Sequence, residues 1–292
     1  YAGLEVGIRV DIQPRDLWGD AAAPTHHAKV TTAGAGQKFG CPRDALEETA
    51  AAIRAAGWTL SGLHAHAGSG VLLKPELWAR TCDALVGAAL EAGIGASLRW
   101  IDCGGGMGVV ERPGQWPLDL PAVGEHLGRA VAEAKRALPD LREVRVEPGR
   151  YCVAPAGALV AQVTQVRSKR AAGGCRTVFV GVSTGMNSLV RPAMYGSHHE
   201  AFLLGVPAAI APKEEAAAPS NAVHVVGPIC ETGDVLCANA RFVPETAKAG
   251  QWIAVANAGA YGAVMGSRYN MREPAPEAVL GLDGVIAFVA RA

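Results

Sequence analysis

The stretch Ile101-Asp102-Cys103-Gly104-Gly105-Gly106-Met107-Gly108 indicates how this chain folds. An apolar run ends there in three consecutive glycines, whose backbones adopt dihedral angles closed to other residues and bring N–H groups close to a ligand. Two interpretations are open: a plain turn at the end of a strand, or a cradle for a phosphate group. The rest of the sequence has to distinguish them.

Strand-like and helix-like segments alternate in the first half of the chain. The strand-like segments are short and apolar, whereas apolar residues recur every three to four positions in the helix-like ones. Asp44 and Glu47 form a capping signal for a helix that stops at Gly57. The expected strands are 4–10, 58–64, 98–102 and 144–147, and the expected helices are 44–57, 75–93 and 123–138. This alternation predicts a parallel sheet or barrel built from βα units.

Polar loops follow three of these strands. They are His64-Ala-His66-Ala-Gly-Ser69, Gly104-Gly-Gly106 and Glu147-Pro-Gly-Arg150. In an eight-stranded βα barrel the active-site groups lie at the carboxyl ends of the strands. We therefore expect the three loops to contribute to one site.

The second half has a different pattern. Its strand-like segments, 160–166, 177–182, 222–226 and 251–256, are rich in β-branched residues and are separated by turn signals rather than by long helices. This predicts a largely antiparallel β domain. The Ala- and Pro-rich segment 201–221 is expected to be a connection. The expected domains are residues 1–155 and 156–292.

Composition narrows the classes of function. The 27 basic and 27 acidic residues balance, which argues against nucleic acid or an anionic membrane surface as a partner. Seven cysteines without a Cys-x-x-Cys pair indicate neither a disulfide framework nor a zinc site, and adjacent His26 and His27 lack a third ligand at a recognisable spacing. No apolar stretch is long enough to cross a bilayer. We expect a cytoplasmic protein without a metal ion.

Four clusters in the second half carry chemical groups. Arg191 and Tyr195 combine a guanidinium with a phenol, which suits recognition of a carboxylate. Cys230 stands beside Glu231 and close to Asp234 in a predicted turn. Gly259-Ala-Tyr261-Gly262 and Ser267-Arg-Tyr269-Asn270 present phenols after a strand. For each cluster a hydrogen-bonded loop without a function is the alternative interpretation.

Six of these motifs, in this order, resemble the fold-type III pyridoxal-phosphate decarboxylases, and in particular the diaminopimelate decarboxylases. They are Gly-Leu-His-Ala-His-Ala-Gly-Ser69, Asp102-Cys-Gly-Gly-Gly106, Glu147-Pro-Gly-Arg150, Arg191-Pro-Ala-Met-Tyr195, Cys230-Glu231-Thr-Gly-Asp234 and Gly259-Ala-Tyr261-Gly-Ala-Val-Met. The match extends from Val6 to about Leu280. The resemblance implies an α/β fold, with the C-terminal half of a pyridoxal-phosphate-binding (β/α)8 barrel followed by a mostly antiparallel β domain.

The resemblance also implies how pyridoxal phosphate is bound. Glu147 would bind the pyridine nitrogen and keep it protonated, and His66 would stack on the ring. The phosphate would be surrounded by backbone amides and a few donors. These phosphate-binding residues are Ser69, Gly104, Gly105, Gly106, Gly149, Arg150 and the hydroxyl of Tyr261.

The implied substrate is an amino acid whose distal end carries both a carboxylate and an ammonium group. Arg150, Arg191 and Tyr195, with Tyr261 beside them, would hold its distal carboxylate, and Glu231 its distal ammonium. Cys230 would donate a proton after carbon dioxide leaves, and would reach the site from the second subunit of a homodimer. Ornithine-type relatives typically have Asp where this chain has Glu231, which favours meso-diaminopimelate as substrate and L-lysine as product.

One residue of the family pattern is missing. The lysine that binds the cofactor covalently lies in a Tyr-Ala-x-Lys-Ala-like context, and none of the seven lysines has this setting. A full barrel also needs eight strands, and only four precede the β domain, so roughly 120 residues are unaccounted for. We therefore expect an N-terminal part to precede this sequence. The segment 272–277 resembles the decarboxylase half of fused aspartokinase–diaminopimelate decarboxylases.

Two alternatives remain at this point. One is decarboxylation of another amino acid or of a carboxylated polyamine. The other is a non-catalytic, partner-binding homologue, for which the missing lysine would be the signature if the sequence were complete. A lysine-bound cofactor has an absorbance band that borohydride abolishes, and this measurement distinguishes an enzyme from such a homologue.

Overall fold

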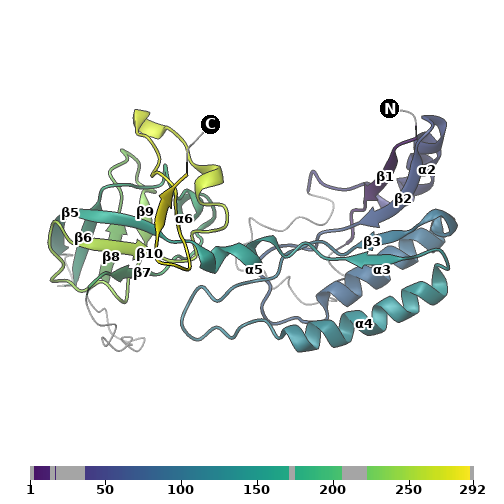
Figure 1. Cartoon of the computed structure of the whole chain (residues 1–292), viewed down its shortest axis with the longest axis horizontal. Coiled ribbons are helices and arrows are strands. Elements are labelled where there is room, and N and C mark those ends of the chain that lie inside the picture. The colour runs from purple at the N-terminus through teal and green to yellow at the C-terminus, as the bar shows by residue number, and fades with distance from the viewer. Residues whose placement is uncertain (1–2, 14–16, 18–36, 171–174, 206–221, 290–292) are drawn as a thin grey trace. The chain divides into compact units, whose positions relative to one another are not determined.

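A computed structural model describes residues 3–13, 17, 37–170, 175–205 and 222–289 of the chain (Figure 1). The chain divides into two compact units, Tyr1–Val110 with Gly114–Tyr151, and Glu111–Pro113 with Cys152–Ala292. The expected domains, 1–155 and 156–292, stay a prediction, because a compact unit need not fold independently. None of the helices in the described part of the chain combines the length and apolar character needed to span a bilayer. His26 and His27 lie outside the described residues.

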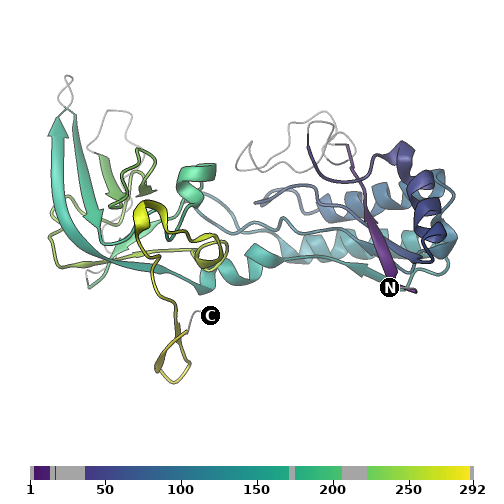
Figure 2. The same cartoon turned by 90° about the horizontal axis from the view of Figure 1, so that it is seen from above.

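A four-stranded parallel sheet forms the centre of the first unit. Its order is β1 (Glu5–Arg9), β2 (Thr59–His64), β3 (Trp100–Asp102) and β4 (Glu143–Arg145). Successive strands are connected through α2 (Leu46–Ala55), α3 (Leu77–Glu91) and α4 (Leu120–Ala137), with short 3-10 turns at Arg43–Ala45 and Gly95–Ser97. The helices α3 and α4 pack side by side (Figure 2). The predicted parallel βα arrangement is confirmed.

The ends of the predicted strands differ from the observed ones in one informative place. We expected 144–147 to be a strand, but β4 is Glu143–Arg145, so Glu147 lies in the loop that follows. Pro148 explains part of this difference, because the residue before a proline and the proline itself end regular hydrogen bonding. Glu147 is therefore placed by the loop rather than by the strand.

One face of this sheet packs against the helices. Leu63 and Ile101 are fully buried on that face, in a cluster with Leu85 and Trp78 of α3. Burial of each such side chain contributes about 2 kcal/mol. The Trp78 Nε1–H donates a hydrogen bond to the carbonyl oxygen of Gly105 at 3.0 Å, so the core also fixes the glycine loop.

The opposite face is shaped by Trp100. A Cβ on Gly62 would come within 2.0 Å of its indole ring, and a Cβ on Gly7 within 2.2 Å, so the ring lies flat across two strands that lack side chains there. The Arg145 guanidinium carbon is 4.8 Å from the Trp100 ring centre on the same face. The two glycines are thus required by close packing, not by unusual backbone angles.

The carboxyl ends of the four strands form one polar row. Arg9 pairs in register with His64, His64 with Asp102, and Asp102 with Arg145. Register partners in neighbouring strands point to the same face of a sheet. The row therefore lies on the Trp100 face, at the edge where βα proteins carry their active sites.

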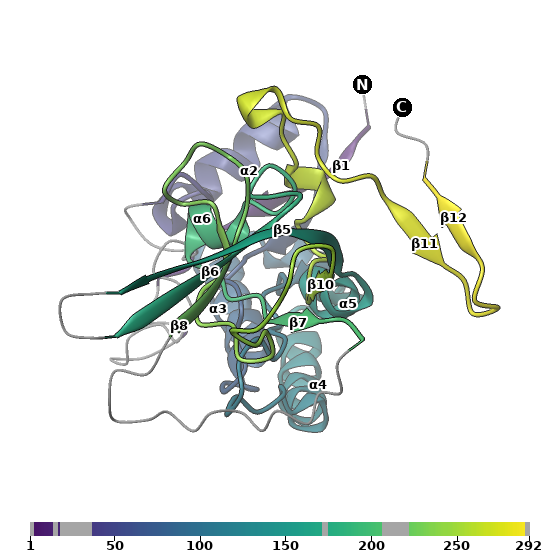
Figure 3. The same ribbon diagram turned by 90° about the vertical axis from the view of Figure 1, so that its left-hand side faces the viewer.

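A six-stranded sheet forms the second unit. The strands are β7 (Ala201–Leu203), β10 (Trp252–Val255), β5 (Leu159–Arg170), β6 (Arg176–Val182), β8 (Ala222–Val226) and β9 (Val235–Cys237), in that spatial order. All pairs are antiparallel except β6 with β8. Figure 3 shows β5, β6 and β8 as neighbours. The predicted mostly antiparallel β domain is confirmed.

Some short strands of the second unit were not expected, β9 among them. The segment 201–221, predicted to be a connection, begins with β7, which pairs with β10; its residues 206–221 lie outside the described part. A separate hairpin is formed by β11 (Ala278–Leu280) and β12 (Ile286–Phe288). Strands of three residues are too short to show a period-two pattern, which explains why sequence reasoning missed them.

Short helical turns complete the second unit. They are α5 (Gly149–Val153), which starts in the first unit, α6 (Arg191–Tyr195), and the 3-10 turns Ala154–Ala156, Ala263–Met265 and Tyr269–Met271. The turn after α6 uses Gly196 in a left-handed conformation with φ of 67°. This arrangement turns the chain back immediately after Tyr195.

Candidate functional site

Three polar side chains converge on the polar row of the first unit. Ligand atoms of His64, Asp102 and Glu147 all lie within 4.8 Å of one another, and His64 Nε2 is 3.6 Å from Glu147 Oε2. One imidazole and two carboxylates are ligands that divalent cations accept, and within the described residues this is the one group of that kind. One Asp102 oxygen already accepts the Gly104 N–H at 2.9 Å. Asp102 therefore also stabilises the backbone of the glycine loop.

His66 lies next to this group as a neutral imidazole. Its Nδ1 accepts a hydrogen bond from the Gly105 N–H at 3.1 Å, which places the ring proton on Nε2. Burial, together with the nearby charges of Arg9 and His64, lowers the pKa of His66 to about 4. His66 is therefore uncharged at neutral pH and held in one orientation.

The three glycines are required by the backbones that surround them. A Cβ would come within 2.4 Å of the Ala65 oxygen at Gly104, 2.3 Å of the Glu147 oxygen at Gly105, and 2.0 Å of the Gly68 oxygen at Gly106. Gly104 and Gly106 also have φ of 69° and 93°, in the left-handed region. The loop thus joins the ends of β2, β3 and β4.

The donors of this loop are divided between structure and a possible ligand. The amides of Gly104 and Gly105 are used by Asp102 and His66. In the described part of the chain, the Gly106 N–H and the Ser69 hydroxyl donate to no other residue, and a Cβ on Gly106 would lie 3.7 Å from the Ser69 Cα. Two adjacent donors of this kind fit a phosphate oxygen.

Glu147 is the link between the glycine loop and the next helix. Its N–H donates to the Gly104 oxygen at 2.9 Å, and its own oxygen accepts the Gly149 N–H at 2.8 Å. Gly149 and the half-buried Arg150 then begin α5. The turn leaves the Glu147 carboxylate more than half exposed beside His64.

Arg9 is a member of this cluster that sequence reasoning missed. Burial lowers the pKa of its guanidinium, while the charges of Glu147 and Asp11 raise it. Its Cζ lies 4.5 Å above the Phe39 ring. In the structure Arg9 ends β1 as His64 and Asp102 end β2 and β3, and the register of the sheet brings the three residues into one row.

A second cluster lies in the second unit around Arg191. The guanidinium carbon is 5.5 Å from the ring centres of both Tyr195 and Tyr261, and Nη2 donates to Ser197 Oγ at 3.0 Å. The residue is only 3% exposed. Tyr261 has a left-handed backbone with φ of 57° and lines a cavity of about 320 Å³. The three predicted residues Arg191, Tyr195 and Tyr261 are thus brought together.

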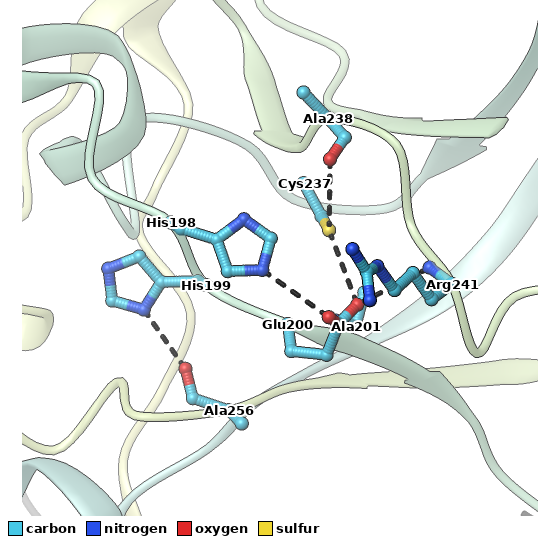
Figure 4. A network of polar contacts seen from close by, with 8 residues as sticks. All are labelled: His198, His199, Glu200, Ala201, Cys237, Ala238, Arg241 and Ala256. Carbon is cyan, nitrogen blue, oxygen red and sulfur yellow. Dashed lines mark hydrogen bonds and ion pairs between the residues drawn. The ribbon is translucent and has the colours of Figure 1, made fainter. Parts of the chain in front are cut away.

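Polar support for the segment after α6 comes from the buried Glu200 (Figure 4). Its carboxylate bonds His198 Nε2 at 3.3 Å and accepts the amides of Ala201 at 3.3 Å and Arg241 at 3.4 Å. Burial acts to raise the pKa of Glu200, but His198 and these amides outweigh it, so that the pKa is lowered. Burial, reinforced by the charge of Glu200, raises the pKa of the neighbouring Cys237 to about 12, so this thiol stays protonated. The network fixes the start of β7.

The two carboxylates near Cys230, those of Glu231 and Asp234, differ in their surroundings. Asp234 is buried and accepts the N–H groups of Met186 at 2.6 Å and Ile229 at 2.7 Å. Glu231, in contrast, is exposed, as is Cys230. Asp234 therefore holds the loop, whereas Cys230 and Glu231 are presented at its surface.

Each unit thus contains its own cluster of predicted residues. The first unit gathers Ser69, His66, Gly104 to Gly106 and Glu147, and the second gathers Arg191, Tyr195 and Tyr261, with Cys230 and Glu231 on a separate loop. The roles assigned to these residues stay predictions.

Comparison with known proteins agrees with this division. Residues 19–154 match the family described as pyridoxal-dependent decarboxylase, pyridoxal binding domain, and residues 150–259 match the pyridoxal-dependent decarboxylase, C-terminal sheet domain. Each match falls largely on one of the two units. The predicted resemblance and the predicted fold class are confirmed.

Similar proteins cover nearly all of the chain. It is 34% identical over 289 residues to a diaminopimelate decarboxylase of Methanothermobacter thermautotrophicus and 36% identical over 287 residues to one of Archaeoglobus fulgidus, covering 97% and 96% of this chain. It resembles the crystal structure of diaminopimelate decarboxylase from Helicobacter pylori complexed with L-lysine, with a TM-score of 0.76 and 27% identity over 98% of this chain.

The chain spans 62% of the length of both curated relatives and 64% of the solved Helicobacter pylori chain. Two consecutive domain matches of one family, supported by relatives at 34% and 36% identity, settle its classification. The chain belongs to the pyridoxal-dependent decarboxylase family.

Proposed function

We propose that the protein decarboxylates meso-2,6-diaminopimelate to L-lysine and carbon dioxide with pyridoxal phosphate. The observation that carries this proposal is the edge of the first unit's sheet, where Glu147, His66 and the Gly106–Ser69 donor pair lie around one loop. The relatives named diaminopimelate decarboxylases support the choice of substrate. When bound, pyridoxal phosphate takes up the electron pair left behind by carbon dioxide.

The first unit supplies groups for both ends of the cofactor. The Gly106 N–H and the Ser69 hydroxyl would donate to the phosphate together with the Arg150 guanidinium, whereas the Gly149 N–H is already bound to the Glu147 carbonyl oxygen. Glu147 would accept the pyridine N–H, and His64 Nε2 lies 3.6 Å from that carboxylate. His66 covers the ring as a neutral imidazole, which adds no positive charge beside the protonated nitrogen.

The second unit supplies groups for the substrate. Arg191 and Tyr195 bind a distal carboxylate, because a guanidinium held between two phenols forms directed bonds to its oxygens. Glu231 binds the distal ammonium, and Cys230 donates the proton that replaces carbon dioxide. The exposure of these last two residues supports a homodimer in which each reaches the site of the other subunit. All seven cysteines are free thiols, which supports a reducing cytoplasm.

The test uses the protein at its natural length, saturated with pyridoxal phosphate. Release of carbon dioxide and formation of L-lysine from meso-diaminopimelate are expected, with little product from ornithine, arginine or a carboxylated polyamine. Glu231→Ala is expected to raise the KM for diaminopimelate, and Cys230→Ala to lower kcat. Turnover of another substrate alone would reject the proposed specificity. A protein with neither turnover nor a borohydride-sensitive absorbance band would be a non-catalytic homologue.

A further inference from the structure

We propose that Tyr269 and Asn270 are positioning residues that hold Glu231 and Cys230 in their working orientations. This inference rests on the proposed function, because it assigns the support of two residues that the function uses. It concerns the Ser267–Asn270 motif, for which neither the fold nor the proposed site gives a role.

Tyr269 acts on Glu231. Its hydroxyl donates a hydrogen bond to Glu231 Oε2 at 3.2 Å. The bond occupies one carboxylate oxygen and fixes the rotamer, so that Oε1 remains available for an ammonium group. The hydrogen bond to Glu231 and the charge of that carboxylate raise the pKa of Tyr269, so the phenol stays a donor at neutral and mildly alkaline pH.

Asn270 acts on Cys230. Its Oδ1 accepts the Cys230 N–H at 2.7 Å. Both Asn270 and Met271 have left-handed backbones, with φ of 54° and 58°. Asn tolerates this conformation better than most residues, whereas Met does not, so the surrounding contacts must hold the turn. Backbone strain of this kind concentrates where a group has to be placed accurately.

The turn and the Cys230 loop share one anchor. The amide of Met186 donates to Asp234 at 2.6 Å and so holds the end of the loop. The neighbouring Asn187 accepts the Ser267 N–H on its carbonyl at 2.9 Å, and its Nδ2 donates to the Glu273 oxygen at 3.1 Å. Both elements are therefore fixed to the same short segment, which limits their relative movement.

A purely structural role is the alternative. Glu231, Cys230, Tyr269 and Asn270 are all exposed, and hydrogen bonds in such places add little to stability because water replaces them. The two bonds consequently affect orientation more than the free energy of unfolding. Their removal should change kinetics and thiol reactivity and leave the melting temperature nearly unchanged.

The variants are Tyr269→Phe, which removes the donor, and Asn270→Gly, which keeps the left-handed backbone but removes the acceptor. Asn270→Asp retains an acceptor and is the rescue variant. Asn239→Gly is the matched control, since Asn239 has φ of 55° and, among the described residues, bonds only through its backbone N–H, towards His224. All are made in the protein at its natural length, loaded with pyridoxal phosphate.

Two readouts separate the inference from the proposed function. With diaminopimelate, Tyr269→Phe should raise KM about 10-fold with a small change in kcat, and Asn270→Gly should lower kcat about 10-fold with partial rescue by Asn270→Asp. Without substrate, iodoacetamide alkylation of Cys230, mapped by mass spectrometry relative to the exposed Cys152, should change at least threefold in Asn270→Gly and not in Asn239→Gly.

Failure of each idea has a distinct result. If the wild-type protein does not act on diaminopimelate, the proposed function fails, while the alkylation ratio still tests the role of Asn270. Unchanged KM in Tyr269→Phe together with an unchanged alkylation ratio in Asn270→Gly would overturn the positioning role. Loss of kcat/KM in proportion to a lowered melting temperature would overturn it as well.

Discussion

The Gly105 amide donates a hydrogen bond to Nδ1 of His66 across 3.1 Å, and this bond fixes the tautomer of an imidazole that burial keeps neutral. Protonation of Nδ1 would remove the acceptor that Gly105 uses. The same contact joins the end of β2 to the glycine loop after β3. One hydrogen bond therefore both holds the glycine loop in place and orients the imidazole of the predicted cofactor site.

The first prediction concerns the pH dependence of stability. Because burial lowers the pKa of His66 from 6.5 to about 4, the unfolded chain binds a proton below pH 6.5 that the folded chain does not. The free energy of unfolding should rise with pH between about 4 and 6.5, by up to about 3 kcal/mol. Urea midpoints across this range should show the rise in the wild type and a smaller one in His66→Gln. A nitrogen NMR shift of a protonated Nδ1 at pH 7 would contradict the assignment.

The second prediction concerns the glycine loop. Gly105→Ala should destabilise the protein by about 1–3 kcal/mol, because its Cβ would come within 2.3 Å of the Glu147 oxygen. Gly128→Ala, in α4 and with no atom of the described residues within 4 Å of the new Cβ, is the control and should be stabilising by up to about 1 kcal/mol. Melting temperatures should move in opposite directions. Equal shifts in both variants would show that the contact with Glu147 relaxes without cost.

The third prediction tests whether Ser69 binds the phosphate group of the cofactor or its ring. Ser69→Ala should weaken the binding of pyridoxal phosphate roughly 10- to 100-fold, since it removes one hydrogen bond to a charged group. Pyridoxal, which lacks the phosphate, should bind the variant and the wild type equally. Absorbance titration measures both dissociation constants. An equal loss for both compounds would place Ser69 away from the phosphate.

The sequence was sufficient to predict those elements and motifs whose physical signal lies within a short segment of the chain. Long periodic segments became α2, α3 and α4, and the strands that end in Arg9, His64 and Asp102 were placed within two residues. Motifs close in sequence, such as Gly104 to Gly106, were recognised for the same reason. The parallel pairing of β6 with β8 was not predicted, because pairing between strands that are distant in the sequence leaves no local pattern.

Contacts between distant residues account for the missed part of the site. The role of Arg9 depends on β1 lying beside β2, and the bond from Tyr269 to Glu231 joins residues 38 positions apart. The two carboxylates Glu231 and Asp234 have the same chemistry in the sequence, and only burial of Asp234 separates their tasks. Residue types alone could therefore not assign these roles.

The fourth prediction concerns Arg191 as the receptor for a carboxylate. Arg191→Lys should raise the KM for diaminopimelate at least 10-fold, because one ammonium cannot keep its contact with Ser197 and also form paired bonds with a carboxylate between two phenols. Ser197→Ala is the matched variant. It keeps the guanidinium but removes the 3.0 Å bond that orients it, so a smaller effect of about fivefold is expected.

Both variants need a control for folding, since Arg191 is only 3% exposed and its loss affects packing in the second unit. A substrate analogue without the distal carboxylate provides it, because its KM should be the same in the wild type and in both variants. If Arg191→Lys raises the KM for this analogue as strongly as for diaminopimelate, the guanidinium supports the fold of the unit and not the distal carboxylate. Selective loss for the dicarboxylic substrate, larger in Arg191→Lys than in Ser197→Ala, assigns the guanidinium to that end of the molecule.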